Sequence, residues 1–164
     1  MEGAVRSRRT KSVLVVLSFL AIVMLAGSGD APAAAVATSL TIPIAGTVDG
    51  APESVSLSGN LSIMTTLVVD PLLASPKERV TIKVVNVSGV GLTSGAKYIA
   101  TGEDRLLRTL AMTDHLDIMF PFYQASVGPR SARSAMASIT LKFDLVTGSI
   151  TGATATFSSP RLPS

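Results

Sequence analysis

The 164-residue chain has no cysteine and no tryptophan, a single histidine, and charged side chains at only 15% of its positions. Without cysteine it forms no disulfide, and it offers no thiolate to zinc or to an iron–sulfur cluster. With one histidine, no site built from several imidazoles forms within one chain. We therefore expect no metal and no cofactor, and the hydrophobic core must supply the stability of the fold.

The net charge of +3 comes mostly from the N-terminal 37 residues. Four basic and two acidic side chains lie there: Arg6, Arg8, Arg9, Lys11, Glu2 and Asp30. The rest of the chain has ten basic and nine acidic residues. A nucleic-acid-binding domain presents a basic patch on its folded surface, and such a balanced charge gives little support for one. We expect no nucleic-acid partner.

An uncharged, almost wholly apolar run extends from Val13 to Ala26, after a basic N-terminal segment. It is too short to cross a bilayer easily, because a spanning helix needs about 20 apolar residues, but it suits the hydrophobic region of a secretory signal peptide. Small residues follow, with A-x-A patterns that end at Ala35 and Ala37. We expect residues 1–37 to form a signal-peptide helix that is cleaved near one of these two alanines.

Such a signal predicts export to a periplasmic or extracellular space. The alternative is an uncleaved signal anchor. The stretch from Val13 to Ala26 would then hold the protein at the membrane, and it is the one membrane contact that the sequence predicts.

Beyond residue 37, β-branched residues and alternating apolar and polar positions indicate β-strands. The clearest alternation runs from Val55 to Val69, which predicts one long half-buried strand, or two strands joined by a bend at Gly59. Similar shorter patterns occur at residues 40–44, 79–87, 97–101, 114–123, 135–145 and 149–158. Residues 103–112 suit a helix or a strand.

Turn residues separate these runs every 8–15 residues. The pattern predicts an all-β fold, either a single antiparallel β-sandwich or a small β-barrel of about seven strands. We expect residues 38–164 to form one domain. The last two runs, with Gly148 available for the turn between them, predict a β-hairpin.

Aromatic residues gather at Phe120, Phe122 and Tyr123, and Arg130 and Arg133 follow soon after. Aromatic faces stack on sugars and planar groups, and arginine binds anions and carboxylates. We therefore predict a ligand-binding surface at these five residues. The alternative is that the rings fill the core at the end of a strand.

His115 and Asp117 share one face of a strand, and Asp114 shares the opposite face with Leu116. An imidazole beside a carboxylate is a weaker alternative site, for acid–base chemistry with a serine nucleophile. A solvated surface strand explains the same residues more simply. The chain has no nucleophile elbow and no phosphate-binding Gly-rich motif. We expect no catalytic residues and no enzymatic activity.

These features favour an exported, non-catalytic β domain that acts outside the cytoplasm as a structural, adhesive or binding module. The alternative is a small-ligand or lipid carrier, because a packed core and a ligand-filled barrel give the same alternation. A hydrolase that uses His115 is a third hypothesis. The long, weakly charged strand from Val55 to Val69 also predicts self-association through strand edges.

Overall fold

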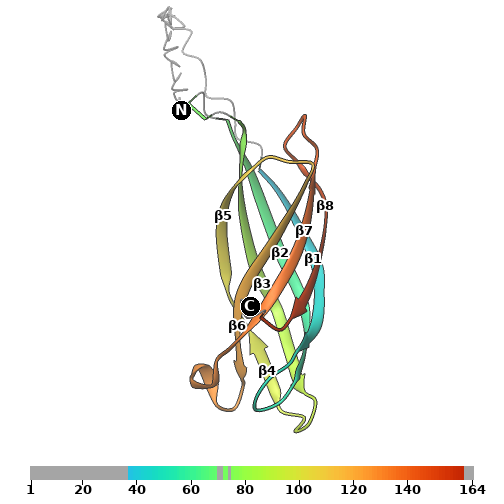
Figure 1. The fold of residues 1–164 in the computed structure, drawn as a ribbon, viewed down its shortest axis with the longest axis vertical. Helices are drawn as coiled ribbons and strands as arrows, with labels where there is room; N and C mark the ends of the chain where they lie inside the picture. The colour runs from blue at the N-terminus through green and yellow to red at the C-terminus, as the bar shows by residue number, and fades with distance from the viewer. Residues whose placement is uncertain (1–36, 70–71, 74, 161–164) are drawn as a thin grey trace, which may run out of the picture. The chain divides into compact units, whose positions relative to one another are not determined.

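The computed structural model describes residues 37–69, 72–73 and 75–160, so the predicted signal peptide, apart from Ala37, lies outside the described residues. The described chain forms eight strands and one 3₁₀ helix (Figure 1): β1 (Ala37–Val48), β2 (Val55–Val68), β3 (Lys77–Gly91), β4 (Lys97–Ala100), β5 (Glu103–Thr109), β6 (Thr113–Gln124), η1 (Gly128–Ser131), β7 (Arg133–Phe143) and β8 (Ile150–Ser158). Within these ranges no helix has the length and apolar character needed to cross a membrane.

Seven strands close into a barrel in the order β2-β1-β8-β7-β6-β4-β3, because β2 pairs with both β1 and β3. β5 is an additional strand that pairs with β3. The all-β prediction and the expected strand number are confirmed, and the architecture is a barrel, not a sandwich. A ring of seven strands cannot alternate in direction all the way round, so one neighbouring pair must be parallel. That pair is β1 and β8, with the register Ala45–Thr156 and Gly46–Phe157.

The barrel interior is filled by side chains. Alternation turns every second residue of each strand inward, and most inward residues are apolar. Many of them are 0% exposed, including Leu57, Leu61, Ile63, Val80 and Ile82. A side chain that faced a water-sized space would show exposed surface, so the space between these residues is occupied. Barrels of about this size have an interior that side chains just fill.

The chain from Glu103 to Thr109 is strand β5 and not a helix. Leu106 packs against the core and its neighbour Leu107 is exposed, as expected for a strand. The leucine spacing that suits a helix is overridden by pairing with β3, in which Leu106 lies opposite Val80.

The strand from Val55 to Val68 is continuous through Gly59. Its register with β3 shifts by one residue between Ser58 and Asn60. The extra residue in β3 is accommodated near Asn86, which has a φ of 51°. The structure therefore has a β-bulge where the sequence allows a bend.

β2 offers no free edge for self-association, because it is hydrogen-bonded to β1 on one side and to β3 on the other. Barrel closure thus removes the edge that the sequence predicted between Val55 and Val69. Among the described strands, β5 alone is hydrogen-bonded to a neighbouring strand on only one side, that of β3. It carries four charged residues, which discourage edge pairing: Glu103, Asp104, Arg105 and Arg108.

Candidate functional site

A shallow depression of about 180 Å³ lies on the outer face of β6, β7 and β8. The strand register brings its walls together, with His115 opposite Thr140 and Asp117 opposite Ser138. The outward side chains around it are polar: His115, Asp117, Ser138, Thr140, Thr154 and Thr156. The sequence predicts the shared face of His115 and Asp117, but it does not predict which hydroxyls lie beside them.

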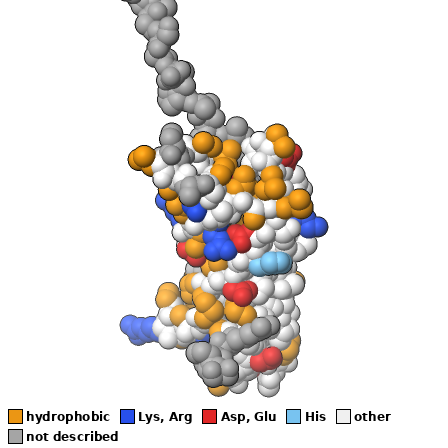
Figure 2. Space-filling view, turned by 45° about the horizontal axis from the view of Figure 1, so that its top comes forward, with side chains coloured by type: hydrophobic (Ala, Val, Ile, Leu, Met, Phe, Trp, Pro, Cys, Tyr) orange, Lys and Arg blue, Asp and Glu red, His pale blue; other side chains and the backbone are white. Residues whose placement is uncertain are grey.

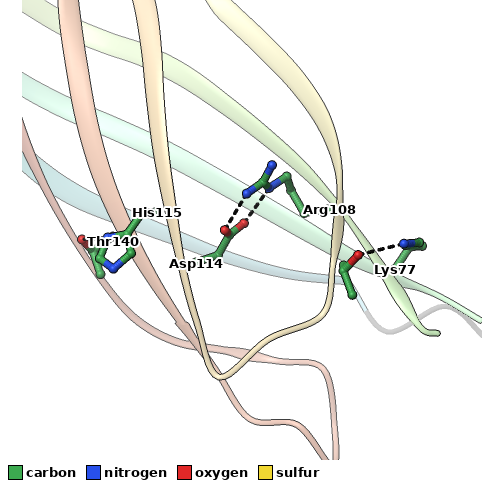
Figure 3. A network of polar contacts seen from close by, with 6 residues as sticks. Lys77, Arg108, Asp114, His115 and Thr140 are labelled. Carbon is green, nitrogen blue, oxygen red and sulfur yellow. Dashed lines mark hydrogen bonds and ion pairs between the residues drawn. The ribbon is translucent and has the colours of Figure 1, made fainter.

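The polar groups of this depression bond across the strands. Nδ1 of His115 lies 3.0 Å from Oγ1 of Thr140 (Figure 3), and the Ser138 hydroxyl donates to Oδ1 of Asp117 at 2.7 Å. His115 and Asp117 are therefore each engaged with β7. Among the described residues, no carboxylate is bonded to the imidazole to orient it as a base. The arrangement offers imidazole, carboxylate and hydroxyl groups that can form hydrogen bonds with polar groups outside the barrel.

The structure separates the five residues of the predicted aromatic site. Phe120 and Phe122 are 2% and 0% exposed, so their rings pack in the barrel core and are closed to a ligand outside. Tyr123 is half-buried opposite Ile99, and Arg130 lies on η1. Two of the three rings thus follow the core-filling alternative.

Arg133, the fifth of these residues, clamps loops at the end of the barrel where β1 finishes. Its guanidinium carbon lies 5.0 Å from the centroid of the Phe122 ring, a cation–π contact. Its Nη1 donates to the backbone carbonyl of Glu53 at 2.8 Å, and its Nη2 donates to that of Asp49 at 3.2 Å. These donors are engaged within the fold, so Arg133 joins β7 to the β1–β2 connection.

Glu53 organises the same end of the barrel. Its carboxylate accepts the Ser94 hydroxyl at 2.6 Å, the Ser94 and Thr93 amides at 2.8 and 3.0 Å, and the Tyr98 hydroxyl at 3.1 Å. The Ser94 bonds, helped by those from Thr93 and Tyr98, lower the pKa of Glu53 to about 2. Burial, together with the bond to Glu53, raises the pKa of Tyr98. The carboxylate is thus held charged as the anchor of the β3–β4 turn.

A bidentate ion pair joins β5 to β6. In the described chain these two strands are not hydrogen-bonded neighbours in the sheet. Nε and Nη2 of Arg108 donate to the two carboxylate oxygens of Asp114 at 2.8 and 2.7 Å (Figure 3). The bond from Arg108 lowers the pKa of Asp114, although partial burial opposes this shift. The sequence alone did not predict this pair, because its two residues face each other only when residues 103–109 form a strand.

Glu78 is a buried carboxyl group in the barrel wall. It is 1% exposed, and neither carboxylate oxygen has a hydrogen-bond partner among the described residues. The nearby Thr65 hydroxyl is engaged with Thr38, at an Oγ1–Oγ1 distance of 2.8 Å. Burial raises the pKa of Glu78, and the Thr65 hydroxyl opposes this in part. In the sequence, Glu78 lies two residues before Val80 and four before Ile82, and this spacing places it on the same inward face of the strand.

Comparison of the chain with protein-family models, with curated proteins and with solved structures finds no match. In the described ranges, no three histidine, aspartate or glutamate side chains gather closely enough to hold a metal ion.

Proposed function

We propose that this chain is exported and acts outside the cytoplasm as a non-catalytic binding module, with its partner on the outer surface of the barrel. The observation that carries the proposal is the filled interior. Core side chains such as Leu61, Ile82 and Phe122 are 0% exposed, which leaves no room for cargo between them. A carrier of small apolar ligands needs a cavity of roughly 300–1,000 Å³.

The polar depression on β6, β7 and β8 supports the same proposal. It is open and lined by hydroxyl groups, with His115 and Asp117 at one side. Hydroxyls donate and accept hydrogen bonds, so this surface suits a partner rich in polar groups. The cross-strand bonds of His115 and Asp117 hold their side chains in place for such contacts.

A nitroxide-labelled fatty acid added to the full-length chain distinguishes this module from a carrier. The readout is paramagnetic broadening of methyl NMR signals from inward Ile63, Ile82 and Ile139, compared with those of outward Met64 and Met119. We expect no preferential broadening of the isoleucine signals, because the probe cannot enter a filled barrel. Stronger broadening inside than outside would mean that the interior opens to take up an apolar ligand, and the carrier alternative would replace the proposal.

A further inference from the structure

The end of the barrel at which β1 begins carries exposed apolar side chains from three separate connections. Figure 2 shows hydrophobic side chains gathered at this upper end. We name them the apolar crown: Val69, Leu72 and Leu73 between β2 and β3, Met112 between β5 and β6, and Leu145 and Val146 between β7 and β8. Val146 is 94% exposed and Met112 67%. Large apolar side chains gathered at one end of a domain mark an interaction surface.

The loops that form the crown are fixed to one another. The Leu110 amide donates to the carbonyl of Pro76 at 3.1 Å, and the Phe143 amide donates to that of Met112 at 3.0 Å. Gly148 lies against the side chain of Leu67 at the end of β2. The three connections are therefore linked around the end of the barrel, and these contacts hold the backbone that carries the apolar side chains.

Basic side chains lie behind the crown on the outer face of the barrel. Lys77 and Arg79 lie on β3 and Lys142 on β7, and Arg79 and Lys142 each stand between two inward-pointing neighbours. Nζ of Lys77 donates to the Thr109 hydroxyl at 2.8 Å (Figure 3). Apolar side chains outermost, with cations one layer behind, match the acyl region and the anionic headgroups of a lipid surface.

The N-terminal segment of the chain joins the barrel at this same end. Ala37 lies opposite Thr66 near the end of β2, so the chain joins the barrel at the crown. The apolar run ends at Ala26, and ten residues separate it from Ala37. Ten extended residues span at most roughly 35 Å. Whenever that run occupies a bilayer, in export or as an anchor, the crown is within reach of the bilayer surface.

We propose that the apolar crown docks on the anionic surface of a lipid bilayer, with the barrel standing on its β1-entry end. This goes beyond the proposed function, because it assigns a second surface and a second kind of partner. It also stands independently of cargo binding, since the crown lies outside the filled interior. The opposite end of the barrel, where Val127 and Leu92 are exposed on separate turns, then points away from the membrane.

Because the chain has no native cysteine, one introduced thiol reports on one position. We would label Val146→Cys, and in a parallel chain Val127→Cys as the matched control, with an environment-sensitive fluorophore. Each full-length chain is mixed with phosphatidylcholine–phosphatidylglycerol vesicles that contain a nitroxide-labelled lipid quencher. Both chains contain the same apolar run, so a difference between them reports the orientation of the barrel.

We expect severalfold stronger quenching at position 146 than at position 127, and weaker quenching at 146 in vesicles of phosphatidylcholine alone. With the label at Met112→Cys, the additional changes Leu145→Asn and Val146→Asn are expected to reduce quenching while the circular dichroism spectrum stays unchanged. Equal quenching at 146 and 127 would overturn the proposal. So would a blue shift at 146 that appears without vesicles and grows with protein concentration, because a second copy of the chain would then cover the crown.

Discussion

Substituting alanine for Gly46 is expected to lower the free energy of unfolding by about 3 kcal/mol, the upper end of the usual cost of overpacking. A Cβ atom at Gly46 would overlap the backbone carbonyl of Phe157. Rotation of a side chain cannot relieve a clash with backbone, so β1 and β8 must move apart. These strands are the one parallel pair of the barrel, with two residue pairs in register. Urea unfolding followed by circular dichroism measures the loss.

Gly152→Ala is the matched control, because it places the same methyl group on a glycine of β8 with no atom within 4 Å of the new Cβ. Its stability is expected to equal that of the wild type or to rise slightly, since alanine loses less backbone entropy on folding than glycine. Equal urea midpoints for Gly46→Ala and the wild type would mean that β1 and β8 do not approach as closely as the barrel requires.

Replacing Glu78 with methionine is expected to raise the free energy of unfolding at pH 7 by about 1–3 kcal/mol, the usual cost of a buried polar group without a partner. Methionine keeps a similar length and removes the carboxylate from the barrel interior. Glu103→Gln is the control, because Glu103 lies on the surface in a pair with Arg105. Exposed pairs of this kind contribute little to stability, so no marked change is expected there.

The gain from Glu78→Met is expected to depend on pH. Burial raises the pKa of Glu78 in the folded state above its ordinary value of 4.5. The folded wild type therefore binds the proton more tightly than the unfolded chain does. The stability that the wild type gains from this tighter proton binding is fully present below the pKa of Glu78 in the unfolded chain. It is lost as pH rises through the pKa of Glu78 in the folded protein. The advantage of the variant should widen over this window. A variant less stable than the wild type at pH 7 would mean that the Glu78 carboxylate has a partner that stabilises the fold.

The strands could be predicted from the sequence, whereas closure of the barrel could not. Alternation in the run from Val55 to Val69 identifies an inward and an outward face, and the structure has both. The same alternation does not say which strands pair. Closure depends on contacts such as Gly46 with Phe157, which lie far apart in the chain. Local pattern gives no information on contacts of this range, so a sandwich and a barrel were equally compatible with it.

At the predicted aromatic site, the position of each ring in the inward–outward alternation of the strand is more informative than the aromatic composition. Phe120 and Phe122 continue the every-second-residue series of the inward Leu116 and Ile118, whereas Tyr123 falls outside this series. Their position in the alternation therefore already indicates that the two phenylalanine rings fill the core. Composition drew attention to the cluster, but it does not distinguish a buried ring from an exposed one. The neighbours of His115 depended on the register with β7, which becomes known only with the fold.

The intact mass of the protein from its native host, together with the cell fraction that contains it, tests the central claim of export most directly. We expect the mass of a chain whose first residue lies between Ala31 and Thr38, in an extracytoplasmic fraction, because the A-x-A patterns that follow the apolar run lie there. A full-length mass in the cytoplasmic fraction would contradict export, and with it the proposal that the barrel binds its partner outside the cytoplasm.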